Sequence, residues 1–180
     1  MKKLFVFLLF ILILLPASAL GEEYLAPEAF ILNPPQGWKS DYSRNFEYSS
    51  PEQGFYFLGH SSNQHMVLEG RIFDDREGYG AFSLYRANKR DLMTYMTNIE
   101  SEYAHVSLSY LKRLESNPQK VPFLLYHVQG TSSGEYYLAD TMSGGWRIRI
   151  LYYPYYAEDR LGEKELAEFE TILSTFEPIR

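Results

Sequence analysis

The strongest chemical pattern in this chain lies around the end of its last predicted strand, where arginines and tyrosines gather. Arg147 and Arg149 stand two residues apart, so they share one face of a strand. Tyr153, Tyr155 and Tyr156 follow, and tyrosine rings stack on sugars or anchor protein partners. A guanidinium pair adds an edge that suits anions. We therefore predict a ligand- or partner-binding surface made of these five residues.

The same segment also has a purely structural interpretation, which stays open at this stage. Aromatic residues favour half-buried strands, so Tyr152 would belong to the core and Tyr153 would pack across strands. Tyr155 and Tyr156 would then cover the turn into the last helix. Arg147 and Arg149 would be solvent-facing partners for acids on the neighbouring strand.

Histidines and carboxylates form a weaker pattern earlier in the chain. We expect His60 and His65 to share one loop, close in sequence to the charged stretch Asp74-Asp75-Arg76-Glu77. A histidine–carboxylate metal site would need a tighter spacing, such as that of His-Glu-x-x-His. We expect two solvated loop histidines, an exposed charged loop, and no metal or other cofactor.

Catalytic motifs are the next possibility. Ser109-Tyr110-Leu111-Lys112 matches Ser-x-x-Lys, but that motif requires a helix. Here the apolar period of two predicts a strand, in which Ser109 and Lys112 would lie on opposite faces. Glu135 and Asp140 have an odd separation and fall on opposite faces of one strand. We predict no catalytic residue. A small hydrolase that joins His127 with Glu135 or Ser132 remains an open alternative, because catalytic groups can converge from distant positions.

The amino-terminal segment predicts export. Lys2 and Lys3 precede an apolar run over 4–15, and Pro16 and Ala17-Ser18-Ala19 follow. This order is typical of a secretory signal peptide. The 12 apolar residues are too few for a membrane span, which needs about 20. We predict a signal peptide over residues 1–21, cleaved after Ala19 or Gly21, with an uncleaved membrane anchor as the alternative.

The composition excludes several kinds of site and disfavours two classes of partner. The chain has no cysteine, which excludes disulfides, thiolate metal sites and an acylated lipoprotein anchor. Its formal charge is -6, and removal of two lysines with the signal peptide makes it -8 (-6 minus 2). Such a protein repels nucleic acid and anionic lipid. We expect a periplasmic or secreted protein that binds an envelope protein or a small molecule, with no membrane span after cleavage.

Periodicity over residues 22–180 predicts a single α+β domain. Apolar residues spaced by three or four predict a helix over 88–103, with Asn88 as its candidate cap, and a second helix before Pro178. Between and before them lie short strands joined by hairpin-length turns, of which Ser143-Gly144-Gly145 is the tightest. The predicted strands include Asn45–Tyr48, Phe55–Leu58, Met66–Phe73, Val106–Tyr110, Phe123–Val128, Glu135–Met142 and Trp146–Tyr153. Hairpins favour an antiparallel sheet, with both helices packed against it.

Three features together resemble the Mog1/PsbP-like fold. They are the turn-rich Pro34-Pro35-Gln36-Gly37-Trp38, the mid-chain helix, and an ending in which a Gly-Gly turn, the strand 146–154 and the helix segment 168–176 follow one another. The resemblance covers most of the chain after residue 21. It implies an antiparallel sheet with a mid-chain and a C-terminal helix, and a non-enzymatic accessory, binding or assembly role. The family has no catalytic motif to carry over.

These observations predict an exported, non-enzymatic binding or accessory protein of the bacterial cell envelope. Its contact surface would be the aromatic and arginine face described above. Two alternatives stay open: the small envelope hydrolase, and a purely structural assembly factor.

Overall fold

The computed structural model describes residues 29–34, 36–40, 53–61, 64–131, 134–156 and 158–179. The predicted signal peptide and the predicted strand Asn45–Tyr48 lie outside these residues. Of the described helices, none combines the length and the apolar character that a membrane crossing requires.

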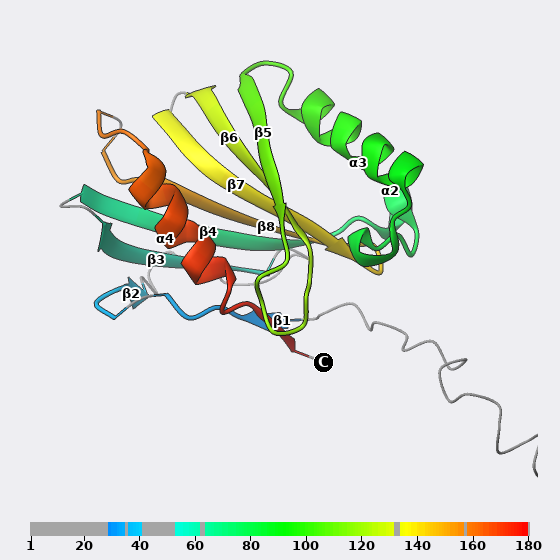
Figure 1. Ribbon diagram of the computed structural model, residues 1–180, viewed down its shortest axis with the longest axis horizontal. Coiled ribbons are helices and arrows are strands. Elements are labelled where there is room, and N and C mark those ends of the chain that lie inside the picture. The colour runs from blue at the N-terminus through cyan, green and yellow to red at the C-terminus, as the bar shows by residue number, and fades with distance from the viewer. Residues whose placement is uncertain are drawn as a thin grey trace, which may run out of the picture.

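A seven-stranded antiparallel sheet forms the centre of the molecule (Figure 1). Its spatial order is β2-β3-β4-β8-β7-β6-β5. The strands are β2 (Lys39–Ser40), β3 (Gln53–Ser61), β4 (Gln64–Asp74), β5 (Ser107–Leu114), β6 (Phe123–Thr131), β7 (Gly134–Ser143) and β8 (Trp146–Pro154). The predicted antiparallel α+β architecture is confirmed.

Two sheet segments meet at the pairing of β4 with β8. The chain forms the hairpin β3–β4 and later the meander β5–β6–β7–β8, and the two join where Met66–Asp74 pairs with Trp146–Pro154. Between them lie α2 (Arg76–Tyr79), the 3-10 turn η2 (Leu84–Arg86) and α3 (Lys89–Glu102). This connection carries the chain from β4 to the far edge at β5.

The helix predicted over 88–103 is confirmed as α3. Asn88 is its N-cap, and the Asn88 side chain accepts hydrogen bonds from the backbone N–H groups of Arg90 and Asp91. These bonds satisfy two of the donors that a helix start leaves unpaired. The apolar side of α3 buries Tyr95 and Ile99 against one face of the sheet, together with Leu124, Tyr126, Val128, Leu138 and Met142.

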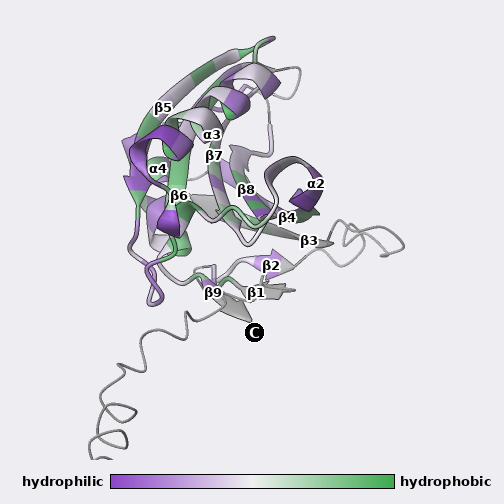
Figure 2. Ribbon diagram, turned by 90° about the vertical axis from the view of Figure 1, so that its right-hand side faces the viewer, coloured by the Kyte–Doolittle hydropathy of each residue, from purple (hydrophilic) through white to green (hydrophobic). Residues whose placement is uncertain are grey.

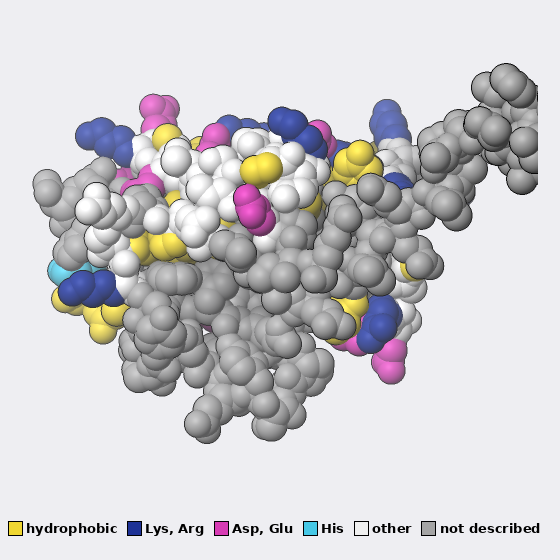
Figure 3. Space-filling view, turned by 90° about the horizontal axis from the view of Figure 1, so that it is seen from below, with side chains coloured by type: hydrophobic (Ala, Val, Ile, Leu, Met, Phe, Trp, Pro, Cys, Tyr) yellow, Lys and Arg dark blue, Asp and Glu magenta, His cyan; other side chains and the backbone are white. Residues whose placement is uncertain are grey.

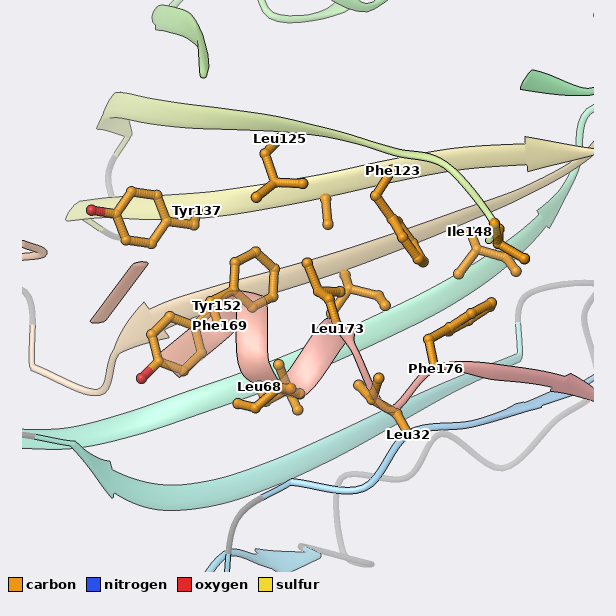
Figure 4. Packing of buried hydrophobic residues seen from close by; sticks show 14 of the residues in the cluster. Leu32, Leu68, Phe123, Leu125, Tyr137, Ile148, Tyr152, Phe169, Leu173 and Phe176 are labelled. Carbon is orange, nitrogen blue, oxygen red and sulfur yellow. The ribbon is translucent and has the colours of Figure 1, made fainter. Parts of the chain in front are cut away.

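The second predicted helix is α4 (Glu163–Leu173), and it covers the other face of the sheet. Phe169 stacks on Tyr152, with ring centroids 5.3 Å apart, and lies parallel to Tyr137 at 6.5 Å (Figure 4). Phe176 lies past the helix end and meets Phe123 edge to face. The two helices therefore lie on opposite faces, and β6 between them is largely hydrophobic along its length (Figure 2).

The alternation predicted for β8 is confirmed. Ile148, Ile150 and Tyr152 belong to the core beneath α4, while Leu151 packs into the cluster beneath α3. Arg147 and Arg149 lie on the same face of β8 as Leu151, because residues two apart on a strand share a face. Both arginines therefore face α3 rather than open solvent.

The turn between β7 and β8 follows from its two glycines. Gly144 and Gly145 have φ values of 58° and 81°, as a two-residue hairpin turn requires. A Cβ on Gly145 would lie 2.1 Å from the backbone oxygen of Gly80 at the end of α2. This close approach places α2 beside the start of β8, the strand that carries Arg147 and Arg149.

One detail of the sequence interpretation is wrong. His60 and His65 do not lie in a loop, because β3 extends to Ser61 and β4 begins at Gln64, so the two histidines are directly paired strand residues. Pro178 follows the last helix, as predicted. It lies in β9 (Glu177–Ile179), which pairs with β1 (Ala29–Ile31) in a second small sheet. The pairing of β1 with β9 joins segments far apart in the sequence, which no local pattern predicts.

Candidate functional site

Arg147 and Arg149 belong to a largely buried ionic network beneath α3. The Nε atoms of both arginines donate to the same oxygen of Asp140, Oδ2, at 2.9 and 2.7 Å. Arg149 and Asp140 are cross-strand partners in the β7–β8 register. The Asp140 side chain is fully buried, and the Arg147 side chain is only 5% exposed. This pairing agrees with the structural interpretation that they are partners of a cross-strand acid, except that the pair is buried.

The helix α3 supplies the rest of the network. Glu102, its last residue, accepts from Arg147 Nη1 at 2.7 Å and from Arg149 Nη2. Tyr95 donates its hydroxyl to the second oxygen of Asp140. We name the set Tyr95, Glu102, Asp140, Arg147 and Arg149 the arginine network. It ties the helix to the sheet.

Burial and charge together fix the protonation states of the arginine network. Burial raises the pKa of the Tyr95 hydroxyl well above its usual value, and the Asp140 charge adds to the effect, so Tyr95 remains a neutral donor. Burial alone would raise the pKa of Glu102. The hydrogen bonds and charges of Arg147 and Arg149 outweigh it, and that pKa lies below its usual value.

The tyrosines at the end of β8 form a second, separate feature. The Tyr153 hydroxyl donates to Glu69 Oε2 at 3.0 Å, which fixes this ring on the sheet. Tyr155 and Tyr156 are each 47% exposed and lie edge to face, with centroids 5.1 Å apart. The Tyr156 ring also meets His65 at 5.8 Å, and the Tyr155 N–H donates to the His65 carbonyl at 2.7 Å. We name Tyr155, Tyr156 and His65 the tyrosine patch.

The arginine network and the tyrosine patch do not lie together. A strand rises about 3.4 Å per residue, so the six steps from Arg149 to Tyr155 separate them by roughly 20 Å. The structure therefore divides the five predicted site residues between two places, with Tyr153 nearer the tyrosine patch. Among the described side chains on the face seen in Figure 3, acidic and basic groups are interspersed.

His127 and Glu135, the pair named for the hydrolase alternative, are in contact. His127 Nε2 lies 3.0 Å from Glu135 Oε2, and the same oxygen accepts from Gln129 Nε2 at 3.1 Å. Glu135 Oε1 accepts from the backbone N–H of Leu161 at 2.8 Å. Desolvation acts to raise the pKa of Glu135, but these hydrogen bonds, led by that of Leu161, lower it below its usual value.

Glu135 should therefore link stability to acidity. A carboxyl whose folded pKa is depressed stabilises the fold above its unfolded pKa and loses that effect as pH falls through the folded pKa. We expect Glu135→Gln to be less stable than the wild type at pH 7, and the difference to shrink below about pH 4. Urea denaturation across this pH range measures it, with exposed Glu77→Gln as the control. A difference that stays constant with pH would contradict the assignment.

The Ser-x-x-Lys segment differs from its prediction in one respect. A β-bulge lies between Tyr110 and Lys112, so Ser109 pairs with His127 while Lys112 pairs with Leu125. His127 and Leu125 both face α4, so Ser109 and Lys112 lie on the same face of β5. The prediction had placed them on opposite faces. Lys112 Nζ bonds Glu170 Oε1 of α4 at 2.6 Å, so the lysine acts as a strand–helix tether.

In the described part of the chain, no group of three histidine, aspartate or glutamate side chains is placed so that it could hold a metal ion. Asp74 instead bonds Arg76, and Asp75 lies 3.5 Å from Arg147 Nη1. The charged stretch predicted as an exposed loop thus ends β4 and opens α2, with one carboxylate turned towards the arginine network.

Sequence reasoning missed Glu102, Tyr95 and Asp140 as partners of the arginines. Asp140 carried a usable signal, because an acid on a predicted strand next to one with Arg149 is a candidate cross-strand pair. Tyr95 and Glu102 had none beyond their place on the predicted helix. Comparison of the chain with protein-family models, with curated proteins and with solved structures finds no match.

Proposed function

We propose that this chain is an exported, non-enzymatic binding protein that contacts its partner through the tyrosine patch. One observation carries the proposal: Tyr155 and Tyr156 are both half exposed, yet His65 holds the Tyr155 backbone and the Tyr156 ring, and the two tyrosine rings pack edge to face. Fixed aromatic rings give large contact area at little conformational cost, which is why they serve as anchors in interfaces. The resemblance to the Mog1/PsbP-like fold agrees with a binding or accessory role.

The proposed compartment is the bacterial cell envelope, and the basis is the amino-terminal sequence alone. A charged start, a short apolar run and a small-residue site are typical of an exported chain. An envelope protein or a small molecule is the proposed partner, since the acidic chain disfavours nucleic acid. Recovery from intact cells of a chain that still begins at Met1 would contradict export with cleavage.

The double variant Tyr155→Ala/Tyr156→Ala tests the patch. We expect it to fold as the wild type does, because both side chains are largely outside the core, and to lose most partner recovery after crosslinking in intact cells. Tyr85→Ala is the matched control, since Tyr85 is 55% exposed on η2, outside the patch. Equal recovery of partner by the double variant and the control would refute the proposal.

A small hydrolase is the second candidate, and the His127–Glu135 contact favours it. A histidine oriented by a carboxylate is one part of a general base. Ser132, the serine named with this pair, lies outside the described residues, and the exposed Ser109 is the cross-strand neighbour of His127. Ester hydrolysis by the wild type that disappears in His127→Ala would favour this candidate over the binding role.

A further inference from the structure

The Glu102 carboxylate is held in the way a bound carboxylate ligand would be. One oxygen accepts from Arg147 Nη1 at 2.7 Å, and the other accepts from Arg149 Nη2. Two guanidinium groups that each take one oxygen form a charge-assisted clamp suited to planar anions. The clamp is independent of the tyrosine patch, which lies at the other end of β8.

Three carboxylates contact the arginines of the clamp, and Glu102 is the one that a ligand can replace. Asp75 makes only a long contact, 3.5 Å from Arg147 Nη1. Asp140 is fully buried on β7 and holds both Nε atoms from beneath. Glu102 is 38% exposed and is the last residue of α3, so its side chain can turn into solvent without disturbing a strand. Departure of Glu102 would leave Arg149 Nη2 without its acceptor and Arg147 Nη1 with only the longer contact to Asp75, while Asp140 keeps the guanidinium groups in place.

Arg147 has more donors than its neighbours use. Its side chain is 5% exposed, and among the described residues its buried Nη2 has no hydrogen-bond partner. Buried donors are almost always paired, because an unpaired one has lost its water without replacement. The described residues therefore leave part of the hydrogen-bonding capacity of Arg147 unused.

We propose that Arg147 and Arg149 form a carboxylate-binding site that Glu102 occupies, and that a small carboxylate ligand binds there by taking the place of Glu102. The tethered Glu102 carboxylate competes at a high effective concentration, so a simple monocarboxylate binds the wild type weakly. Binding also frees the end of α3, where Tyr103 caps the helix and packs 5.5 Å beneath the Arg149 guanidinium. The site thereby couples a ligand to the docking of the helix.

Glu102→Ala with acetate as the probe tests this site. We expect acetate to raise the melting temperature of the variant relative to chloride at equal ionic strength, since a ligand that binds only the folded state stabilises it. The affinity of Glu102→Ala for acetate should exceed that of the wild type by at least about tenfold, because the tethered competitor is gone. Calorimetric titration of both proteins measures the ratio.

Two further variants make the result decisive. Glu100→Ala removes an exposed carboxylate from the same helix and should respond to acetate as the wild type does. Glu102→Ala/Arg149→Ala removes one arm of the clamp and should lose the response. An acetate response of Glu102→Ala no larger than that of Glu100→Ala, or one that survives loss of Arg149, overturns the proposal.

If Glu102→Ala does not fold in chloride, refolding becomes the readout. Recovery of folded protein in acetate but not in chloride supports the site. Failure to refold in both salts overturns the proposal, because acetate should bind Arg147 and Arg149 in place of the missing Glu102 carboxylate.

Discussion

Asp140→Ala is expected to lower the free energy of unfolding by about 3–5 kcal/mol, the usual cost of removing one partner from a buried ion pair. The carboxylate is fully buried and accepts from Arg147 Nε, Arg149 Nε and the Tyr95 hydroxyl. Its loss leaves three donors, two of them charged, without their acceptor in a region closed to water. Since small domains are stable by about 5–15 kcal/mol, chemical denaturation will resolve the change easily.

Two matched variants separate the causes of that loss. Asp140→Asn keeps the shape and one acceptor oxygen but removes the charge, so it should fall between the wild type and Asp140→Ala. Asp74→Ala removes a carboxylate that pairs with Arg76 at the surface and should have a much smaller effect. If Asp140→Ala proves no more damaging than Asp74→Ala, the arginine network does not hold α3 to the sheet.

Phe169→Ala is expected to cost about 3–5 kcal/mol, as truncation of a fully buried aromatic residue does. The ring is 0% exposed and lies parallel to those of Tyr152 and Tyr137, so it joins α4 to β7 and β8. The neighbours are held by the sheet and cannot collapse into the space. Denaturation measures the total loss, and amide hydrogen exchange should rise first in α4, which loses its main contact.

A conservative variant and a surface variant serve as controls for Phe169→Ala. Phe169→Leu keeps an apolar side chain in the site and should lose less than the alanine variant, because less volume is vacated. Met93→Ala removes a side chain that is 59% exposed on α3, and should stay within about 0.5 kcal/mol of the wild type. A Phe169→Ala variant as stable as Met93→Ala would show that α4 is not anchored by this ring.

Local sequence determined most elements of this fold. The periods of three and four in α3 and α4, and of two in β8, correctly separated helix from strand. Asn88 and the Gly144-Gly145 turn marked boundaries, because a cap and a tight turn depend on residues only a few positions apart. Such signals require no knowledge of the tertiary structure.

The candidate site was predictable only in part. The sequence placed Arg147 and Arg149 on one strand face and named His127 with Glu135, a contact that the structure contains. The prediction joined the arginines and Tyr155 in one surface, although the six steps from Arg149 to Tyr155 along an extended strand already imply that they lie apart. The sequence did not predict the bulge after Tyr110, which has no marker in the residues themselves.

What only the tertiary structure decided is the environment of each charge. The alternation of residues along β8 placed Arg147 and Arg149 on the face opposite to Ile148 and Ile150. If nothing covered that face, both arginines would lie in solvent. The docking of α3 on that face, 45 residues away in sequence, instead buried Arg147 and brought Glu102 to it. Whether a guanidinium is solvated or desolvated depends on what covers it, and coverage results from packing between distant segments, which no local pattern encodes.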